Sequence, residues 1–352
     1  MTTGERAPAA ARIMVPMAPM LRDEWYVAAF SEELATGPLG RQICGERVAL
    51  YRRGDGGVTA LEDRCSHRRY PLSRGRVQGN ELQCGYHGAR FDAAGKCVAI
   101  PGQAAIPAGF HLRAYPVHEK DGVVFIWMGD AAPADPATLP DWRINAAPDW
   151  AQVRGLHHMP ANYQLVLDNL LDLTHVEFVH KNLGGPGIAE NPLEFSVDGD
   201  RVHTFRMMRN VDLPGLFKAM GKSGKFDRWQ KQHVAAPSYV YFEAGAEPAG
   251  SNDPPAAPHH VVIQGVTPES ATSTHYFWMA ARHFAIDDDA LSDTMRAITI
   301  DAFDEDVAVL AAQQGAIDAD GDRRERPFNA FQCDAAGIAV RRILARRLDS
   351  VA

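Results

Sequence analysis

Short apolar runs, separated by glycine, proline and acidic turn residues, mark the first 130 residues of the chain. Runs of about 4 to 8 residues with this punctuation are typical of β-strands. The pattern therefore predicts a small all-β domain. The strands expected in it are 47–51, 57–63, 81–84 and 122–128.

The second half of the chain mixes two periodicities. Residues 163–179, 290–314 and 335–348 have the apolar spacing of helices. An Asp198-Gly199-Asp200 turn divides a hairpin over 193–208, because Asp-Gly between alternating runs favours a tight β-turn. Further strands are expected at 239–243, 260–266 and 272–281, the last two joined at Pro268-Glu269. This half is predicted to be an α+β domain with an antiparallel sheet.

Four prolines between residues 130 and 150 indicate an irregular linker between the two domains. We therefore predict a flexible tail over 1–20, an all-β domain over 21–132, a linker over 133–150 and an α+β domain over 151–352.

Charge and cysteine usage narrow the class of protein. The 352 residues carry a net charge of −8, the wrong sign for binding nucleic acid through its phosphates. The longest apolar run, about 123–128, is far shorter than a membrane-spanning helix, and no compact apolar signal segment opens the chain. Five cysteines are an odd number that suits a disulfide framework poorly. We expect a soluble cytoplasmic protein.

Two Cys/His pairs predict a metal site in the first domain. Cys65-Ser-His67 and Cys84-Gly-Tyr-His87 are separated by 16 residues, so two loops can bring two thiolates and two imidazoles together. Such a set suits either a tetrahedral zinc ion or a Rieske [2Fe–2S] cluster, in which the cysteines bind one iron and the histidines the other. The pairs alone do not decide between these groups.

A second metal site is predicted from His175 and His180. Five residues on a regular helix place two side chains about 140° apart, so the helix must distort over 176–179 if both histidines bind one ion. Asp172, three residues before His175, shares its helical face. Its carboxylate is therefore expected to hydrogen-bond the ring nitrogen of His175 that does not bind the metal, or to lie beside it.

The third ligand is predicted from the helix over 290–314. Phe303, Val307 and Leu310 define its inward stripe, and Asp306 lies beside that stripe, whereas Asp304 and Glu305 point away. A carboxylate that faces a core needs a partner. Two histidines and one carboxylate form the facial triad of non-haem Fe(II) oxygenases.

The surroundings of these residues resemble one known family. The first loops read Cys65-Ser66-His67-Arg68, Pro71-Leu72-Ser73 and Cys84-Gly85-Tyr86-His87-Gly88, and resemble the Rieske domain of Rieske non-haem iron oxygenases. Asn169, Asp172 and both histidines of the second site, with the Glu305-Asp306 helix, resemble the catalytic domain of that family. Motifs such as Trp25-Tyr26-Val27-Ala28 and Thr267-Pro268-Glu269 are similar to the vanillate O-demethylase and toluene-sulfonate methyl-monooxygenase type.

The resemblance implies a fold, cofactors and partners. The fold would be an all-β Rieske domain followed by a catalytic domain whose antiparallel sheet curls around helices, as in helix-grip folds. Cys65, His67, Cys84 and His87 would hold a [2Fe–2S] cluster, and His175, His180 and Asp306 would hold Fe(II). In a head-to-tail homotrimer, His87 of one subunit would contact Asp172 of the next, and Asn169 and Asp172 would assist catalysis.

The resemblance also implies an oxygenase that uses O2 and electrons from a separate NAD(P)H-dependent reductase of the flavin or ferredoxin type. The chain itself contains neither a G-x-G-x-x-G loop nor a plant-type ferredoxin motif. The reaction implied is O-demethylation of a methoxylated aromatic acid with release of formaldehyde. Hydroxylation of a methyl, methylene or ring carbon, and N-demethylation, are alternatives.

Substrate contacts are expected from the antiparallel sheet and the helix facing it. The candidates are His233, Tyr241, Gln264 and Trp278. Two readings from other classes are an electron-transfer Rieske protein and a zinc-stabilised binding module. The first has no use for the second metal site, and the second would be colourless.

Overall fold

The computed structural model describes residues 12–13, 19–130, 132–181, 183, 187–213, 215–218, 223–250, 259–320 and 328–351. It divides into two compact units. The first unit is Arg22–Ala146 with Thr267–Ser270, and the second is the remainder of the chain. Of the predicted tail, only 12–13 and 19–20 lie within the described residues. The predicted linker is divided between the units after Ala146.

The first unit is built from β-strands, as its turn-punctuated apolar runs predict. Its strands are β2 (Glu24–Phe30), β3 (Leu39–Ile43), β4 (Glu46–Arg52), β5 (Val58–Glu62), β6 (Arg76–Gln78), β7 (Glu81–Gln83), β8 (Arg90–Phe91), β9 (Cys97–Ala99), β10 (Ala114–Tyr115), β11 (Val117–Lys120) and β12 (Val123–Met128). Within the described residues they form sheets in the orders β10-β5-β4-β3, β11-β12-β2 and β6-β7-β8-β9. Every residue of β12 is buried, so this strand forms much of the unit's core.

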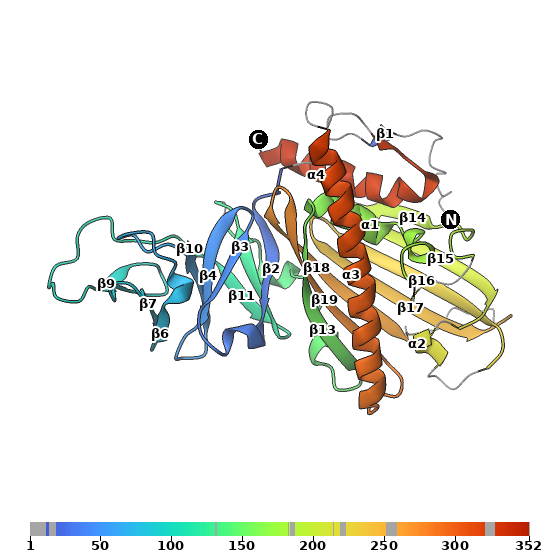
Figure 1. Ribbon diagram of the computed structural model, residues 1–352, viewed down its shortest axis with the longest axis horizontal. Helices are drawn as coiled ribbons and strands as arrows, with labels where there is room; N and C mark the ends of the chain where they lie inside the picture. Colours follow the sequence, from blue (N-terminus) through green and yellow to red (C-terminus); the bar gives the residue numbers. More distant parts are fainter. Residues whose placement is uncertain are drawn as a thin grey trace. The chain divides into compact units, whose positions relative to one another are not determined.

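The second unit contains a large antiparallel sheet (Figure 1). Its strands are β13 (Ala151–Met159), β14 (Glu194–Asp198), β15 (Arg201–Val211), β16 (Phe226–Ala235), β17 (Tyr239–Pro248), β18 (His260–Ser270) and β19 (Ser273–Arg282). Their order in the described part of the chain is β13-β19-β18-β17-β16-β15-β14. A two-residue pairing joins β1 (Arg12–Ile13) to β20 (Phe328–Asn329).

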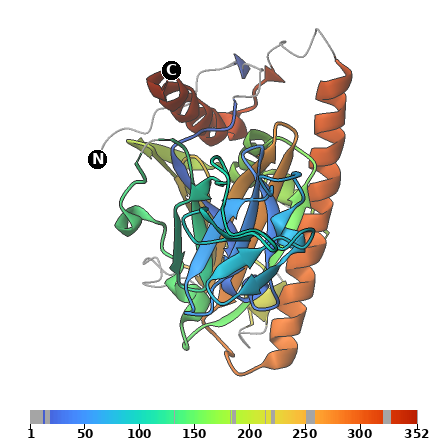
Figure 2. The same cartoon turned by 90° about the vertical axis from the view of Figure 1, so that its left-hand side faces the viewer.

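Helices cover one face of this sheet. They are α1 (Tyr163–Leu171), α2 (Gly215–Lys218), α3 (Asp289–Ala319) and α4 (Ala335–Val351). One buried cluster joins residues of α1, α3 and α4 to sheet residues such as Val234 and Trp278. Both views show α3 as one continuous helix (Figures 1 and 2). Of the described helices, none is both long enough and apolar enough to cross a membrane.

Helix α1 begins at a side-chain cap and ends where the backbone leaves the helical conformation. The Asn162 side chain accepts a hydrogen bond from the Gln164 N–H, 2.9 Å away, and caps the helix N-terminus. The predicted helix over 163–179 was too long, because Asp172 leaves the helical region with φ −89° and ψ 89°. An ion pair between Asp168 of α1 and Arg341 of α4, with Nε 3.0 Å from each carboxylate oxygen, holds the two helices together.

The turn predicted at Pro268-Glu269 was wrong. Strand β18 continues to Ser270, and the chain reverses after it. The Pro268 and Glu269 carbonyl groups accept hydrogen bonds from the Cys44 and Gly45 N–H groups at 2.7 and 2.9 Å, which holds this segment extended. Strand β13 was not predicted. Strand β16 was not predicted either, because it carries Arg228, Gln230 and Gln232 where an alternating strand would show apolar residues.

Packing at Gly155 gives a test of the sheet. A Cβ atom at Gly155 would lie 2.4 Å from Cζ2 of Trp278, whose indole is held by a 2.8 Å hydrogen bond from Nε1 to His157 Nδ1. We predict that Gly155→Ala lowers the free energy of unfolding by about 1–3 kcal/mol, because the indole cannot move away freely. Urea unfolding followed by circular dichroism measures this change.

Gly315→Ala is the matched control for the same measurement. Gly315 lies in α3, and a Cβ atom there would have no heavy atom within 4 Å. Alanine in an exposed helix should stabilise the protein by about 0.5–1 kcal/mol. Equal stability of the two variants would contradict the packing argument.

Candidate metal centres

Two loops of the first unit bring both Cys/His pairs together. The Cys65 loop closes through a hydrogen bond from the Cys65 N–H to the Tyr70 carbonyl at 2.9 Å, and the Cys84 loop through one from the Cys84 N–H to the Ala89 carbonyl at 2.8 Å. The ring centroids of His67 and His87 are 4.6 Å apart. The structure therefore brings the two predicted pairs to one place.

The two residue types differ in exposure. Cys65 and Cys84 are buried, at 2% and 3% exposed, whereas His67 and His87 are exposed. Burial raises the pKa of the Cys65 thiol to about 11, so the thiol must lose its proton when it binds a metal. Two sulfur donors inside and two nitrogen donors at the surface fit a cluster whose inner iron binds cysteine and whose outer iron binds histidine.

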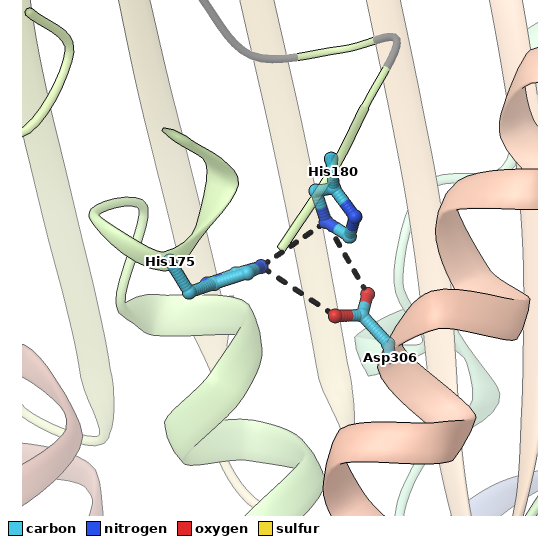
Figure 3. A group of neighbouring side chains, drawn as sticks. All are labelled: His175, His180 and Asp306. Atoms are coloured by element: carbon cyan, nitrogen blue, oxygen red, sulfur yellow. Dashed lines mark hydrogen bonds and ion pairs between the residues drawn. The ribbon is translucent and has the colours of Figure 1, made fainter. Parts of the chain in front are cut away.

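In the second unit, two histidines and one carboxylate converge (Figure 3). The Nε2 atoms of His175 and His180 are 3.2 Å apart. Each lies 3.6 Å from one carboxylate oxygen of Asp306. Ligands about 2.1 Å from one ion and at right angles to each other are about 3 Å apart, so the set could hold a metal ion on one face.

The other ring nitrogen of each histidine, Nδ1, has its own partner, which leaves both Nε2 atoms free to face Asp306. His175 Nδ1 contacts the backbone carbonyl of Asp172. His180 Nδ1 lies 3.2 Å from a carboxylate oxygen of Glu305. Because a nitrogen that donates to an acceptor carries the ring proton, each Nε2 keeps its lone pair for a metal.

Asp306 is buried as its position on the helix predicts. It is 3% exposed. Burial raises the pKa of its carboxyl group to about 6, although His175 and a 3.1 Å hydrogen bond from Asn169 Nδ2 act in the opposite direction. Asn169 thus holds one oxygen of this carboxylate. A positive ion at the site would compensate the buried charge.

The expected contact of the Asp172 carboxylate with His175 was wrong in one respect. Helix α1 ends at Leu171, so Asp172 and His175 do not share a helical face, and the carbonyl of Asp172 is turned toward the imidazole instead. The carboxylate accepts a hydrogen bond from the Thr174 N–H at 2.8 Å. It also lies in a group with Cys333 and Asp334, whose ligand atoms are all within 4.8 Å of one another.

Glu305 was missed by the sequence reasoning. Its angular position on the helix points away from Phe303, but its long side chain reaches His180, and its exposure falls to 21%. The signal that could have found it is the adjacent pair Glu305-Asp306. Two neighbouring acids on a helix can serve a metal ligand and the support of another ligand.

A cavity of about 140 Å³ opens beside His175, His180 and Asp306. Its walls are mainly apolar, from α1, α3 and strands β16 to β18. Gln264, one of the predicted substrate contacts, lines it and has a side-chain oxygen without a hydrogen-bond partner.

The other predicted contacts lie elsewhere. His233 and Tyr241 pair across β16 and β17, on the sheet face opposite to the neighbouring, cavity-lining Gln232 and Phe242. Trp278 packs its ring 5.5 Å from that of Phe303. None of these three is among the residues that line the cavity within the described structure.

Comparisons with known protein families give a separate match in each of the two units of the chain. Residues 24–116 match the Rieske [2Fe-2S] domain, and residues 159–350 match the vanillate O-demethylase oxygenase C-terminal domain. The chain is 40% identical to the vanillate O-demethylase oxygenase subunit of Pseudomonas sp. (strain HR199 / DSM 7063), over 93% of this chain and 94% of that protein.

Two further matches concern a relative and a solved structure. A putative toluene-4-sulfonate monooxygenase system iron-sulfur subunit of Comamonas testosteroni is 39% identical, over 94% of this chain and 97% of that protein. The crystal structure of dicamba monooxygenase with non-heme iron and dicamba superposes with a TM-score of 0.82 at 32% identity, covering 95% of this chain and 99% of that chain.

The contact between His180 and Glu305 generates a prediction. We expect Glu305→Gln to lower the affinity of the His175, His180 and Asp306 set for a divalent metal by about 10- to 100-fold, because the neutral amide orients and polarises His180 less well. Anaerobic titration of Fe(II) against a competing chelator measures the affinity.

Asp301→Asn is the control for this titration. Asp301 lies on the same helix but is exposed, so its loss of charge should leave the affinity unchanged. An unchanged affinity in Glu305→Gln would show that Glu305 does not support His180.

Proposed function

Because the chain belongs to the Rieske oxygenases of the vanillate O-demethylase type, we propose that it demethylates a methoxylated aromatic acid. It is the oxygenase component of a Rieske monooxygenase. The observation that carries the proposal is the cavity that opens directly beside His175, His180 and Asp306.

In this proposal four residues hold the [2Fe–2S] cluster and three hold Fe(II). Cys65 and Cys84 bind the inner iron of the cluster, and His67 and His87 bind the outer one. His175, His180 and Asp306 bind the mononuclear ion. When bound, the cluster supplies single electrons and the mononuclear iron supplies a place for O2 activation.

The protein side chains prepare this chemistry. The Asp172 carbonyl and Glu305 hold the two imidazole rings in place, and Asn169 holds the Asp306 carboxylate. The apolar walls from α1 and α3 exclude water and place an aromatic ring against the three ligands. Hydroxylation of a methoxy carbon then gives an unstable product that loses formaldehyde.

The size of the cavity supports a substrate with one aromatic ring. An apolar cavity of about 150 Å³ holds benzene, and the cavity here is about 140 Å³. The free side-chain oxygen of Gln264 suits a donor such as a phenolic hydroxyl group. His233, Tyr241 and Trp278 do not line the cavity, so Gln264 is the contact retained from the four predicted.

Electron delivery involves other chains in this proposal. A separate NAD(P)H-dependent reductase of the flavin or ferredoxin type reduces the cluster. In a head-to-tail homotrimer, the exposed His87 faces Asp172 of the next subunit, and the Asp172 carbonyl contacts His175. Asp172 thus positions His175 and forms the last step of the route. We place this system in the cytoplasm.

The alternative functions fall into two groups, according to whether they require the second metal centre. An electron-transfer Rieske protein needs neither the buried Asp306 nor the cavity beside it. A C-hydroxylase or N-demethylase would use the same residues and differ only in its product.

Removal of Asp306 tests the assignment of the ligands. We expect Asp306→Ala to keep the visible and EPR spectra of the Rieske cluster and to lose the mononuclear iron, so that iron falls from about three to about two per chain. Activity should be lost as well. Asp301→Ala is the control, and full iron content in Asp306→Ala would remove Asp306 from the set of ligands.

Formaldehyde release tests the reaction. Protein with both iron centres, a surrogate reductase, O2 and NADH should release one formaldehyde for each methoxybenzoate consumed, because hydroxylation of the methyl group gives a hemiacetal that breaks down to a phenol and formaldehyde. Consumption without formaldehyde, with oxygen retained in the product, would identify a C-hydroxylase. No turnover across methoxylated and methylated aromatic acids would refute the proposed substrate class.

A further inference from the structure

Arg228 on β16 is a buried cation. Its side chain lines the same cavity as His175 and Asp306, and Arg228 is only 9% exposed. Among the described residues, no carboxylate forms an ion pair with it, and its Nε atom has no hydrogen-bond partner. Burying an ionised group in this way is costly unless a partner is supplied.

A second buried arginine increases this cost. Arg206, on the neighbouring strand β15, is 1% exposed and donates a 3.0 Å hydrogen bond to the carbonyl of Leu173. Burial, and then the charge of Arg206, lower the pKa of Arg228 to about 10, so Arg228 still carries its charge at neutral pH. Arg206 is not part of the cavity lining and has the charge of Asp172 near it, so Arg228 is the cavity-lining cation that an anion would compensate.

The groups around Arg228 are arranged to accept a ligand. The ring of Phe217 lies 5.6 Å from its guanidinium carbon and supports it through a cation–π contact. Burial, and then Arg228, lower the pKa of His260 to about 4, so this cavity-lining imidazole is neutral and has one N–H to donate. Gln230, 4% exposed, also lines the cavity.

Two polar side chains of the cavity wall, Gln232 and Thr299, already have partners within the protein. Gln232 donates to the Leu170 carbonyl at 2.6 Å and accepts from the Thr204 hydroxyl at 3.0 Å. The Thr299 hydroxyl donates to the Met295 carbonyl at 2.7 Å. Among the described residues of this wall, buried side-chain atoms without a partner occur on Arg228 (Nε), Gln230 (Oε1) and Gln264 (Oε1), and Arg228 is the charged one of the three.

The register of the sheet separates Arg228 from the helix that leads to the metal ligands. Gln232 bonds the last turn of α1, which runs into His175, and Arg228 lies four residues away from Gln232 on the same strand. Four residues of a strand span roughly 13 Å. The cavity thus joins an end near α1 to a cationic end, and a single-ring molecule can extend from one toward the other.

We propose that Arg228, with His260 and Gln230, binds the anionic group, a carboxylate or a sulfonate, of a single-ring aromatic substrate. The inference rests on the proposed function for the aromatic ring and adds the group that orients it. The guanidinium binds two oxygens of the anion side by side, His260 donates to one of them, and the Gln230 amide N–H₂ is a further donor. Held in this way, the opposite edge of the ring is directed toward His175, His180 and Asp306.

Binding measurements test the proposal without turnover. Calorimetry with the iron-loaded wild-type protein compares 3-methoxybenzoate and 3-methoxybenzenesulfonate with the neutral 3-methoxybenzamide. We expect at least one anion to bind about 30-fold or more tightly than the amide, and the better of the two identifies the group. Equal affinities for all three in the wild-type protein would overturn the proposal.

Substitutions assign the preference to Arg228. Arg228→Gln should lose the preference for the anion while its affinity for the amide changes by less than about threefold. Arg228→Lys keeps the charge but not the paired donors, so it should retain an intermediate preference. If Arg228→Gln does not fold, the lysine variant and the wild-type comparison decide the matter. An unchanged preference in Arg228→Gln or in Arg228→Lys, or an equal loss for anion and amide, would contradict the assignment.

Lys231→Gln is the matched control. Lys231 lies on the same strand with its side chain on the opposite face, over the ring of Trp229. The Lys231→Gln substitution removes one positive charge, as Arg228→Gln does, and should leave the affinities for the two anions and the amide unchanged. Because no turnover is needed, an anion preference without formaldehyde release would refute the proposed function alone, and formaldehyde release without the preference would refute this inference alone.

Discussion

The second unit is organised around one carboxylate that is almost completely buried. Asp306 is 3% exposed on a long helix whose other inward residues are mainly apolar. An ionised group in such a place requires compensation. Asn169 provides part of it through a hydrogen bond, and His175 and His180 face the carboxylate from the same segment, more than a hundred residues away in sequence. The end of α1 and the position of α3 are therefore coupled through this one side chain.

The compensation is incomplete without a cation. The two imidazoles direct unprotonated nitrogens at the carboxylate, since their other nitrogens are occupied by the Asp172 carbonyl and by Glu305. The lone pairs of the two nitrogens and the negative carboxylate repel each other. The fold therefore holds three electron-pair donors in an arrangement that a bound cation would stabilise. The same logic applies at Cys65 and Cys84, which are both buried. Burial raises the pKa of the Cys65 thiol, and a bound metal would displace its proton.

Features that depend on local pattern could be predicted from the sequence. Four strands of the first unit (β4, β5, β7 and β12), the turn at Asp198-Gly199-Asp200 and the inward position of Asp306 follow from turn residues and helical periodicity. Features that depend on distant partners could not. The end of α1 follows from the backbone at Asp172, and the continuation of β18 follows from its bonds to Cys44 and Gly45. Strand β16 was hidden because its cavity face is polar where an ordinary strand is apolar.

Helix α3 is one unbroken rod that carries two kinds of residue. Asp306 serves the cluster of donors, while Met295 and Thr299 form part of the cavity wall. A single inserted residue between them would rotate one set by about 100° relative to the other. An insertion there would therefore separate the metal ligand from its cavity wall. The shape of the cavity can change among related chains through side-chain exchanges on α3, or through the strands, α1, α2 and the segment after α1 that complete the lining. The spacing of residues along α3 is therefore fixed, whereas the side chains of the sheet that face it can vary.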